Sequence, residues 1–109
     1  MKRCGKLGIQ GIIAPAAYGM HSKRLPPFSS PRTEEEDTRV LLEGLEKIRE
    51  AAEKYEVSLL LEPLNRYEDH MVNTVEQAVN IARQVDSPFV KVMADLYHMN
   101  IEEANIGQA

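Results

Sequence analysis

The sequence predicts an α/β fold with a parallel sheet, and three observations support this prediction. Short apolar runs alternate with longer amphipathic segments in the order strand, helix, strand, helix, strand. The run over residues 57–61 is almost continuously apolar, which is typical of a strand covered on both faces in a parallel sheet. Both amphipathic segments open with a capping box. Alternation of this kind indicates βαβ units with right-handed crossovers.

The first three elements follow from local sequence signals. Residues 7–15 carry three isoleucines between Gly8 and Pro15, which predicts a short buried strand. Residues 20–32 contain several prolines and predict a long loop with a functional role. A helix is predicted over residues 33–55, because Thr33 and Glu36 form a capping box. Its apolar residues recur at helical spacing: Leu41, Leu45, Ile48, Ala52 and Tyr55.

The second half of the chain repeats the pattern. The apolar run that starts at Val57 predicts a second strand that ends at Glu62. Thr74 and Gln77 form another capping box and open a helix that reaches residue 85. The segment "FVKVMAD" predicts a third strand over residues 89–95, ending at Asp95. Asn100, with an acid three residues later, predicts the start of one more helix.

The composition limits the function classes. With 109 residues, 43% hydrophobic and 28% charged, the chain is in the range of one soluble globular domain. A net charge of -4 argues against a nucleic-acid partner, which would require clustered basic residues. No run approaches the ~20 apolar residues that span a bilayer. Cys4 is the only cysteine, so no internal disulfide can form and we expect a cytoplasmic protein.

Two carboxylates close consecutive strands in this scheme. Adjacent parallel strands run ~4.8 Å apart, so Glu62 and Asp95 would reach one point beyond the sheet if their strands are neighbours. A divalent cation such as Mg²⁺ or Mn²⁺ suits such oxygen ligands. The alternative is that each acid caps the helix or loop after it. His98 follows Asp95 by three residues and has four roles open to it: metal ligand, hydrogen-bond partner of a substrate hydroxyl, proton shuttle or structural residue.

Two segments carry a resemblance to a known family. "LLLEPLNRYEDHMVNT" and "VMADLYHMNIEEA" resemble the sugar isomerase and epimerase superfamily with a xylose-isomerase-like TIM barrel, notably the D-tagatose (D-psicose) 3-epimerases and hydroxypyruvate-isomerase-like proteins. The resemblance covers both motifs in order and at the right interval, and it extends more loosely to most of the chain. The family motif has Asp-Thr where this chain has Asp95-Leu96.

The resemblance implies roles for four residues. Glu62 is expected to bind the metal and to exchange a proton with the substrate carbon, and Asp95 is expected to be the second metal ligand. Glu68 and His98 match positions that hydrogen-bond substrate oxygens. The implied activity is a metal-dependent ketose epimerase or aldose-ketose isomerase that acts on a sugar or sugar phosphate through an enediolate. Mn²⁺ is the first expectation for the ion, followed by Mg²⁺ or Co²⁺.

The resemblance also implies that residues 1–109 form the central part of a barrel. A complete (β/α)8 barrel has about 250 residues, and the family completes its metal site with a histidine and a second glutamate on later strands. We therefore expect a partial TIM barrel of about strands four to six with the intervening helices. The remainder of the barrel, or a homo-oligomer, is expected as its partner.

Two other functions are kept as hypotheses. One is a fragment of an endonuclease-IV-like zinc phosphodiesterase, which the acidic charge disfavours. The other is a non-catalytic, truncated remnant that folds only with a partner copy.

Three further residues in or next to the motif, and one acidic run elsewhere, have expected roles. Asn65 is expected to brace Glu62 or the loop, and Arg66 is expected to pair with an acid on the same rim. His70 is expected on the surface. The acidic run over residues 34–37 is expected to serve only as a helix N-terminus.

Overall fold

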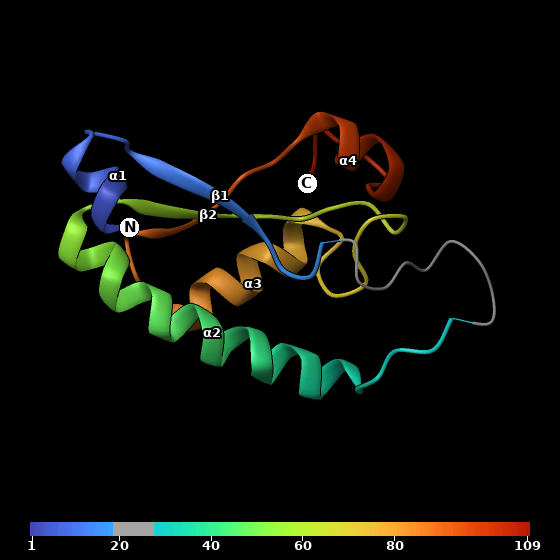
Figure 1. The fold of residues 1–109 in the computed structure, drawn as a ribbon. Helices are drawn as coiled ribbons and strands as arrows, with labels where there is room; N and C mark the ends of the chain where they lie inside the picture. The colour runs from blue at the N-terminus through green and yellow to red at the C-terminus, as the bar shows by residue number, and fades with distance from the viewer. Residues whose placement is uncertain (19–27) are drawn as a thin grey trace.

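The sheet contains three parallel strands in the order β1-β2-β3 (Figure 1). The structure is a computed structural model that describes residues 1–18 and 28–109, so most of the predicted loop over residues 20–32 lies outside the described residues. The strands span Gly11–Pro15 (β1), Ser58–Glu62 (β2) and Val90–Val92 (β3). This arrangement confirms the predicted α/β fold with a parallel sheet.

Four helices accompany the described strands. They span Lys2–Lys6 (α1), Glu34–Tyr55 (α2), Val75–Val85 (α3) and Leu96–Glu102 (α4). Figure 1 shows α2 and α3 side by side on one face of the sheet, whereas α4 lies beyond the strand ends. In the described part of the chain, no helix combines the length and the apolar character needed to cross a membrane.

Both predicted capping boxes are present. The Thr33 side chain accepts a hydrogen bond from the Glu36 amide, and the Glu36 carboxylate accepts one from the Thr33 amide at 2.9 Å. Thr74 and Gln77 form the same reciprocal pair at the start of α3. These contacts satisfy amides that have no partner within their helix, which is why local sequence predicts the starts of α2 and α3 well.

The core lies between the sheet and the two long helices. Leu59 and Leu61 of β2 are 3% and 1% exposed. They pack in one cluster with residues of α2, α3 and β3: Leu45, Ala78, Ile81, Val85 and Val90. Side chains alternate along a strand, so Leu60 and Glu62 lie on the opposite face, where both are only partly buried. The prediction that both faces of β2 are covered is therefore wrong for the described residues.

The first strand also differs from its prediction. It begins at Gly11 rather than near Leu7, and Ile13 is 50% exposed although a buried strand was expected. Ile13 pairs with Leu60 in the sheet register, so both side chains lie on the face away from α2 and α3. One layer of helices covers one face of a sheet, and the described residues place no second helical layer over Ile13.

The last two predicted boundaries are wrong. β3 ends at Val92 rather than at Asp95, and α4 begins at Leu96 rather than near Asn100. Asp95 is the N-cap of α4, because its Oδ1 accepts a hydrogen bond from the Tyr97 amide at 2.8 Å. Aspartate and asparagine are about equally good N-caps, so the sequence offered two starts and the structure uses the earlier one. Asn100 lies inside the helix.

Asp37 and His70 form a buried polar contact that contradicts two predictions. Asp37 is 5% exposed and His70 is 7% exposed, and Nε2 of His70 lies 3.1 Å from Oδ2 of Asp37. Arg32 Nε also donates to Asp37 Oδ1 at 2.7 Å. Thus His70 is not a surface residue, and Asp37 does more than favour the helix N-terminus. The two residues are 33 positions apart, so only the tertiary fold brings them together.

We expect the Asp37→Asn substitution to lower the free energy of unfolding by about 1–3 kcal/mol, because it weakens a buried charge contact. Burial raises the pKa of Asp37, but the contacts with Arg32 and His70 outweigh burial and leave that pKa below its ordinary value. An aspartate whose pKa is lowered on folding stabilises the fold fully at pH values above its ordinary pKa. This stabilisation is lost as the pH falls through the lowered pKa. Urea unfolding at neutral and acidic pH measures the difference.

The matched control for this prediction is Glu43→Gln, which changes an exposed acid of the same helix. We expect it to change stability by no more than about 0.5 kcal/mol. An Asp37→Asn variant as stable as this control at neutral pH would contradict the role of the buried contact.

Candidate metal centre

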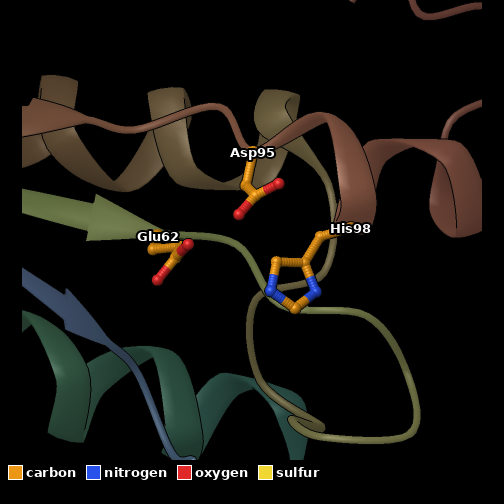
Figure 2. A group of neighbouring side chains, drawn as sticks. All are labelled: Glu62, Asp95 and His98. Atoms are coloured by element: carbon orange, nitrogen blue, oxygen red, sulfur yellow. The ribbon is translucent and has the colours of Figure 1, made fainter.

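Glu62, Asp95 and His98 lie together at the carboxyl ends of β2 and β3. One ligand atom from each residue lies within 4.8 Å of the other two. Figure 2 shows the two carboxyl groups and the imidazole ring facing a common space, with Glu62 at the end of its strand and His98 on α4. The structure therefore brings together the two acids that the sequence placed at neighbouring strand ends, and it adds the histidine.

The strand pairing explains why the two acids meet. Leu61 pairs with Val92 in the sheet, and the Met93 amide donates to the Leu61 carbonyl at 3.0 Å. This hydrogen bond keeps the segment that follows β3 next to the end of β2, shortly before α4 begins. Asp95 uses Oδ1 for its helix cap and does not use Oδ2 in that contact. The capping role and a role in the site are thus compatible, although the sequence analysis treated them as alternatives.

The electrostatics of the site oppose ionisation of Glu62. Burial is the largest influence and raises the pKa of Glu62 above its ordinary value, and the neighbouring Asp95 and Glu68 carboxylates raise it further. His98 acts in the opposite direction. A cation placed between Glu62 and Asp95 would remove the repulsion between their charges, so the donor set fits a divalent ion with oxygen ligands.

The His98 ring is oriented by Asn65. Nδ1 of His98 lies 3.1 Å from the backbone nitrogen of Asn65 and 2.9 Å from its side-chain Nδ2. Both Asn65 groups are N–H donors, so Nδ1 acts as the acceptor and Nε2 carries the proton of the neutral ring. Nε2 is then a donor on the part of the ring that Asn65 does not occupy. Metal-bound histidines usually show the reverse pattern, with the second nitrogen donating its proton.

Asn65 also holds Glu68. It is 1% exposed, and its Nδ2 donates to Glu68 Oε1 at 3.0 Å. One amide therefore links the two residues for which substrate contacts were predicted. The expected brace at Asn65 is confirmed for the loop, with His98 and Glu68 as its partners. The expected partner of Arg66 is also found, because its guanidinium donates to Glu102 at 2.9 and 3.0 Å.

Asp69, the residue after Glu68, has a structural role that no sequence motif predicts. It is completely buried, and its carboxylate accepts hydrogen bonds from the Ala17 amide at 3.0 Å and the Met71 amide at 2.7 Å. It thereby ties the segment after β1 to the segment after β2. The only sequence signal was an acid next to the motif, and that signal does not separate a structural acid from a solvated one.

Comparisons with known proteins identify similar sequences and structures. A family model described as a xylose isomerase-like TIM barrel matches residues 1–108. A 3-dehydro-D-guloside 4-epimerase from Escherichia coli (strain K12) is 40% identical over 109 residues, which is 100% of this chain and 42% of that relative.

Two solved structures show the same arrangement of elements. A 3-keto-D-glucoside 4-epimerase from E. coli in its apo form superposes with a TM-score of 0.91 at 41% identity, covering 96% of this chain and 40% of that one. A D-psicose 3-epimerase from Clostridium cellulolyticum H10 with D-tagatose gives a TM-score of 0.80 at 36% identity, covering 99% and 36%. The chain thus spans less than half of each of these relatives and matches part of a barrel structure.

Proposed function

The chain belongs to the xylose isomerase-like TIM barrel family, and from this membership we propose that its site takes part in the metal-dependent epimerisation of a keto sugar. The supporting observation is the convergence of Glu62, Asp95 and His98 within 4.8 Å at the strand ends. The relatives above are sugar epimerases by name. In this proposal the three strands correspond to about strands four to six of an eight-stranded barrel.

Glu62 and Asp95 would hold the metal through carboxylate oxygens. Mn²⁺ is the first choice, with Mg²⁺ and Co²⁺ next, because hard oxygen donors dominate the set. When bound, such an ion polarises a carbonyl group and its neighbouring hydroxyl. His98 is better suited to the substrate than to the ion, because its Nε2 carries a proton that it can donate to a sugar oxygen.

The reaction is a proton transfer next to the substrate carbonyl. Glu62 removes the proton from the carbon beside the carbonyl, and the electron pair of that C–H bond moves toward the carbonyl oxygen to form an enediolate. A proton returned to the opposite face, by an acid such as the second glutamate that the resemblance places on a later strand, inverts the carbon. A proton returned to the neighbouring carbon isomerises the sugar. Glu68 accepts a hydrogen bond from a substrate hydroxyl, while His98 donates to an oxygen.

Burial and the neighbouring carboxylates raise the pKa of Glu62 in the metal-free site. A bound cation would offset the part that the like charges contribute, whereas the part that burial contributes would still favour a base that takes up and releases a proton. Because the pKa of Glu62 is raised in the metal-free site, a metal ion must compete with a proton for its carboxylate. The nuclease hypothesis gains no support from the relatives described above, all of which are named as sugar epimerases.

We expect the protein, with its metal site completed by the rest of the barrel or by a partner copy, to bind Mn²⁺ and to catalyse exchange of a substrate hydrogen with solvent. The experiment incubates the protein with Mn²⁺ and D-psicose in D₂O and measures deuterium in the recovered sugar by mass spectrometry. This readout follows proton removal alone and does not require a complete epimerisation. Deuterium should enter only when Mn²⁺ is present, because removal of the proton depends on polarisation of the carbonyl.

Two controls accompany this measurement. EDTA should abolish the exchange, and D-glucitol should acquire no deuterium because it has no carbonyl. A protein that binds Mn²⁺ but leaves both D-psicose and a 3-keto glucoside unlabelled would contradict the proposed proton transfer. Zinc binding with hydrolysis of a phosphodiester would favour the nuclease instead.

A further inference from the structure

One face of α4 contacts the segment after β2 at two neighbouring points. His98 and Glu102 are four residues apart in the helix, so their side chains lie on the same face. His98 contacts Asn65, and Glu102 contacts Arg66, which is the next residue along the chain. These four residues form a closed ring of contacts that links α4 to the segment carrying Glu68.

The contact between Glu102 and Arg66 is the more extensive of the two. Oε1 of Glu102 accepts from the Arg66 backbone nitrogen at 2.6 Å and from its Nε at 2.9 Å, and Oε2 accepts from Nη2 at 3.0 Å. The Glu102 side chain is only 7% exposed, whereas that of Arg66 is 48% exposed. Charge-assisted bonds of this paired geometry are strong and directional.

The backbone bond matters most for the site. It holds in place the peptide that joins Asn65 to Arg66, which directly follows the Asn65 amide and side chain that both donate to Nδ1 of His98. We infer that Glu102 is a positioning residue, which acts through Arg66 and Asn65 to keep Nδ1 of His98 an acceptor and Nε2 the proton donor. This inference rests on the proposed function, in which Nε2 donates to a sugar oxygen.

Glu103 provides a matched comparison. It is the C-cap of α4 and also accepts a long-range hydrogen bond, from the Val75 amide at 2.8 Å, so it joins the end of α4 to the first residue of α3. Its contact lies at the start of α3, ten residues after Asn65. If each acid only anchored α4, the loss of either one would have no specific effect on the tautomer of His98, whereas a positioning role affects His98 only through Glu102.

The experiment records long-range ¹H–¹⁵N NMR spectra of the histidine rings in the metal-free, sugar-free protein at neutral pH. The wild-type chain should show His98 as a single tautomer with the proton on Nε2. Glu102→Ala should lose this single-tautomer pattern, and Glu103→Ala should keep it. Glu102→Gln retains an oxygen that can accept from the Arg66 amide, so it should restore most of the pattern.

Arg66→Ala separates the two parts of the contact, because it removes the guanidinium and keeps the backbone N–H donor. We expect a smaller loss than with Glu102→Ala. The inference is overturned if a folded Glu102→Ala protein keeps the wild-type pattern, or if Glu103→Ala loses it equally. Circular dichroism shows whether Glu102→Ala folds. If it does not, Glu102→Leu is measured in its place, and a wild-type tautomer pattern in Glu102→Leu also overturns the inference.

This readout is independent of the proposed activity. It uses neither metal nor sugar, so an intact dependence of His98 on Glu102 in a protein that exchanges no substrate hydrogen would contradict the proposed function alone. A Glu102 variant with normal exchange, a normal KM and an altered tautomer pattern would confirm the structural link and refute its importance for the substrate.

Discussion

Replacing Glu62 with glutamine is expected to weaken Mn²⁺ binding by at least about 100-fold, because loss of a residue that merely supports a ligand already costs about 10–100-fold. Glutamine keeps the size of the side chain and one oxygen but removes the charge that attracts the ion. The deuterium exchange described above should disappear in this variant, since no carboxylate remains to remove the proton. Isothermal titration with Mn²⁺ at neutral pH measures the loss of affinity.

The same substitution should stabilise the metal-free protein at neutral pH. Burial and two neighbouring carboxylates raise the pKa of Glu62, so its ionised form destabilises the fold. This cost is absent below the ordinary glutamate pKa, and it is fully present above the raised pKa. Urea unfolding should therefore show the variant and the wild type converging in acid and separating as the pH rises.

In the wild-type protein, metal affinity should rise with pH, whereas the contribution of Glu62 to the stability of the metal-free fold falls with pH. Carboxylate ligands must lose their protons to bind an ion, so Mn²⁺ affinity should fall as the pH drops through the raised pKa of Glu62. Glu50→Gln, a change at an exposed acid of α2, is the control and should leave affinity and stability nearly unchanged. A Glu62→Gln protein that binds Mn²⁺ as well as this control would refute the assignment of Glu62.

Leu61→Ala is expected to lower the free energy of unfolding by about 2–5 kcal/mol. Leu61 is 1% exposed and packs in the cluster between β2 and the two long helices. The substitution removes apolar contacts and leaves a cavity that rigid neighbours fill only in part. Denaturant unfolding followed by circular dichroism measures the change, with the slope against urea expected to stay constant.

The neighbouring residue offers a matched control on the same strand. Leu60 points to the face away from α2 and α3 and is only partly buried, so Leu60→Ala removes the same atoms with fewer contacts. We expect its effect to be less than half that of Leu61→Ala. Equal losses would indicate that both faces of β2 are covered, as the apolar run first suggested, and would place a further packing element over Leu60.

Local signals in the sequence predicted the helices with the clearest caps. Thr33 and Thr74 were correctly identified as helix starts, because a capping box depends on residues within three positions of each other. The motif around Glu62 and Asp95 also indicated that two strand ends would meet, since parallel strands place their carboxyl ends at one edge. Their roles in catalysis and metal binding, like those of Glu68 and His98, stay proposals.

Sequence signals gave wrong predictions for the end of β3, the start of α4 and the burial of His70, because tertiary contacts determine these features. The strand predicted to reach Asp95 ends at Val92, because Asp95, five residues before Asn100, is the residue that caps the helix. His70 was placed on the surface because an isolated histidine after a motif carries no burial signal. Its burial depends on Asp37, which belongs to α2, whereas His70 lies in the connection between β2 and α3.

The sequence by itself determined the order of the elements, two helix starts and the residues from which a metal site can be built, because these depend on neighbours along the chain. Only the tertiary structure decided which face of β2 is buried, and that His98 accepts at Nδ1. It also showed that Asp95 caps a helix at the same position where it faces the site. The physical reason is distance along the chain: His98 lies 33 residues from Asn65, and their hydrogen bond forms only once β2, β3 and α4 have packed together.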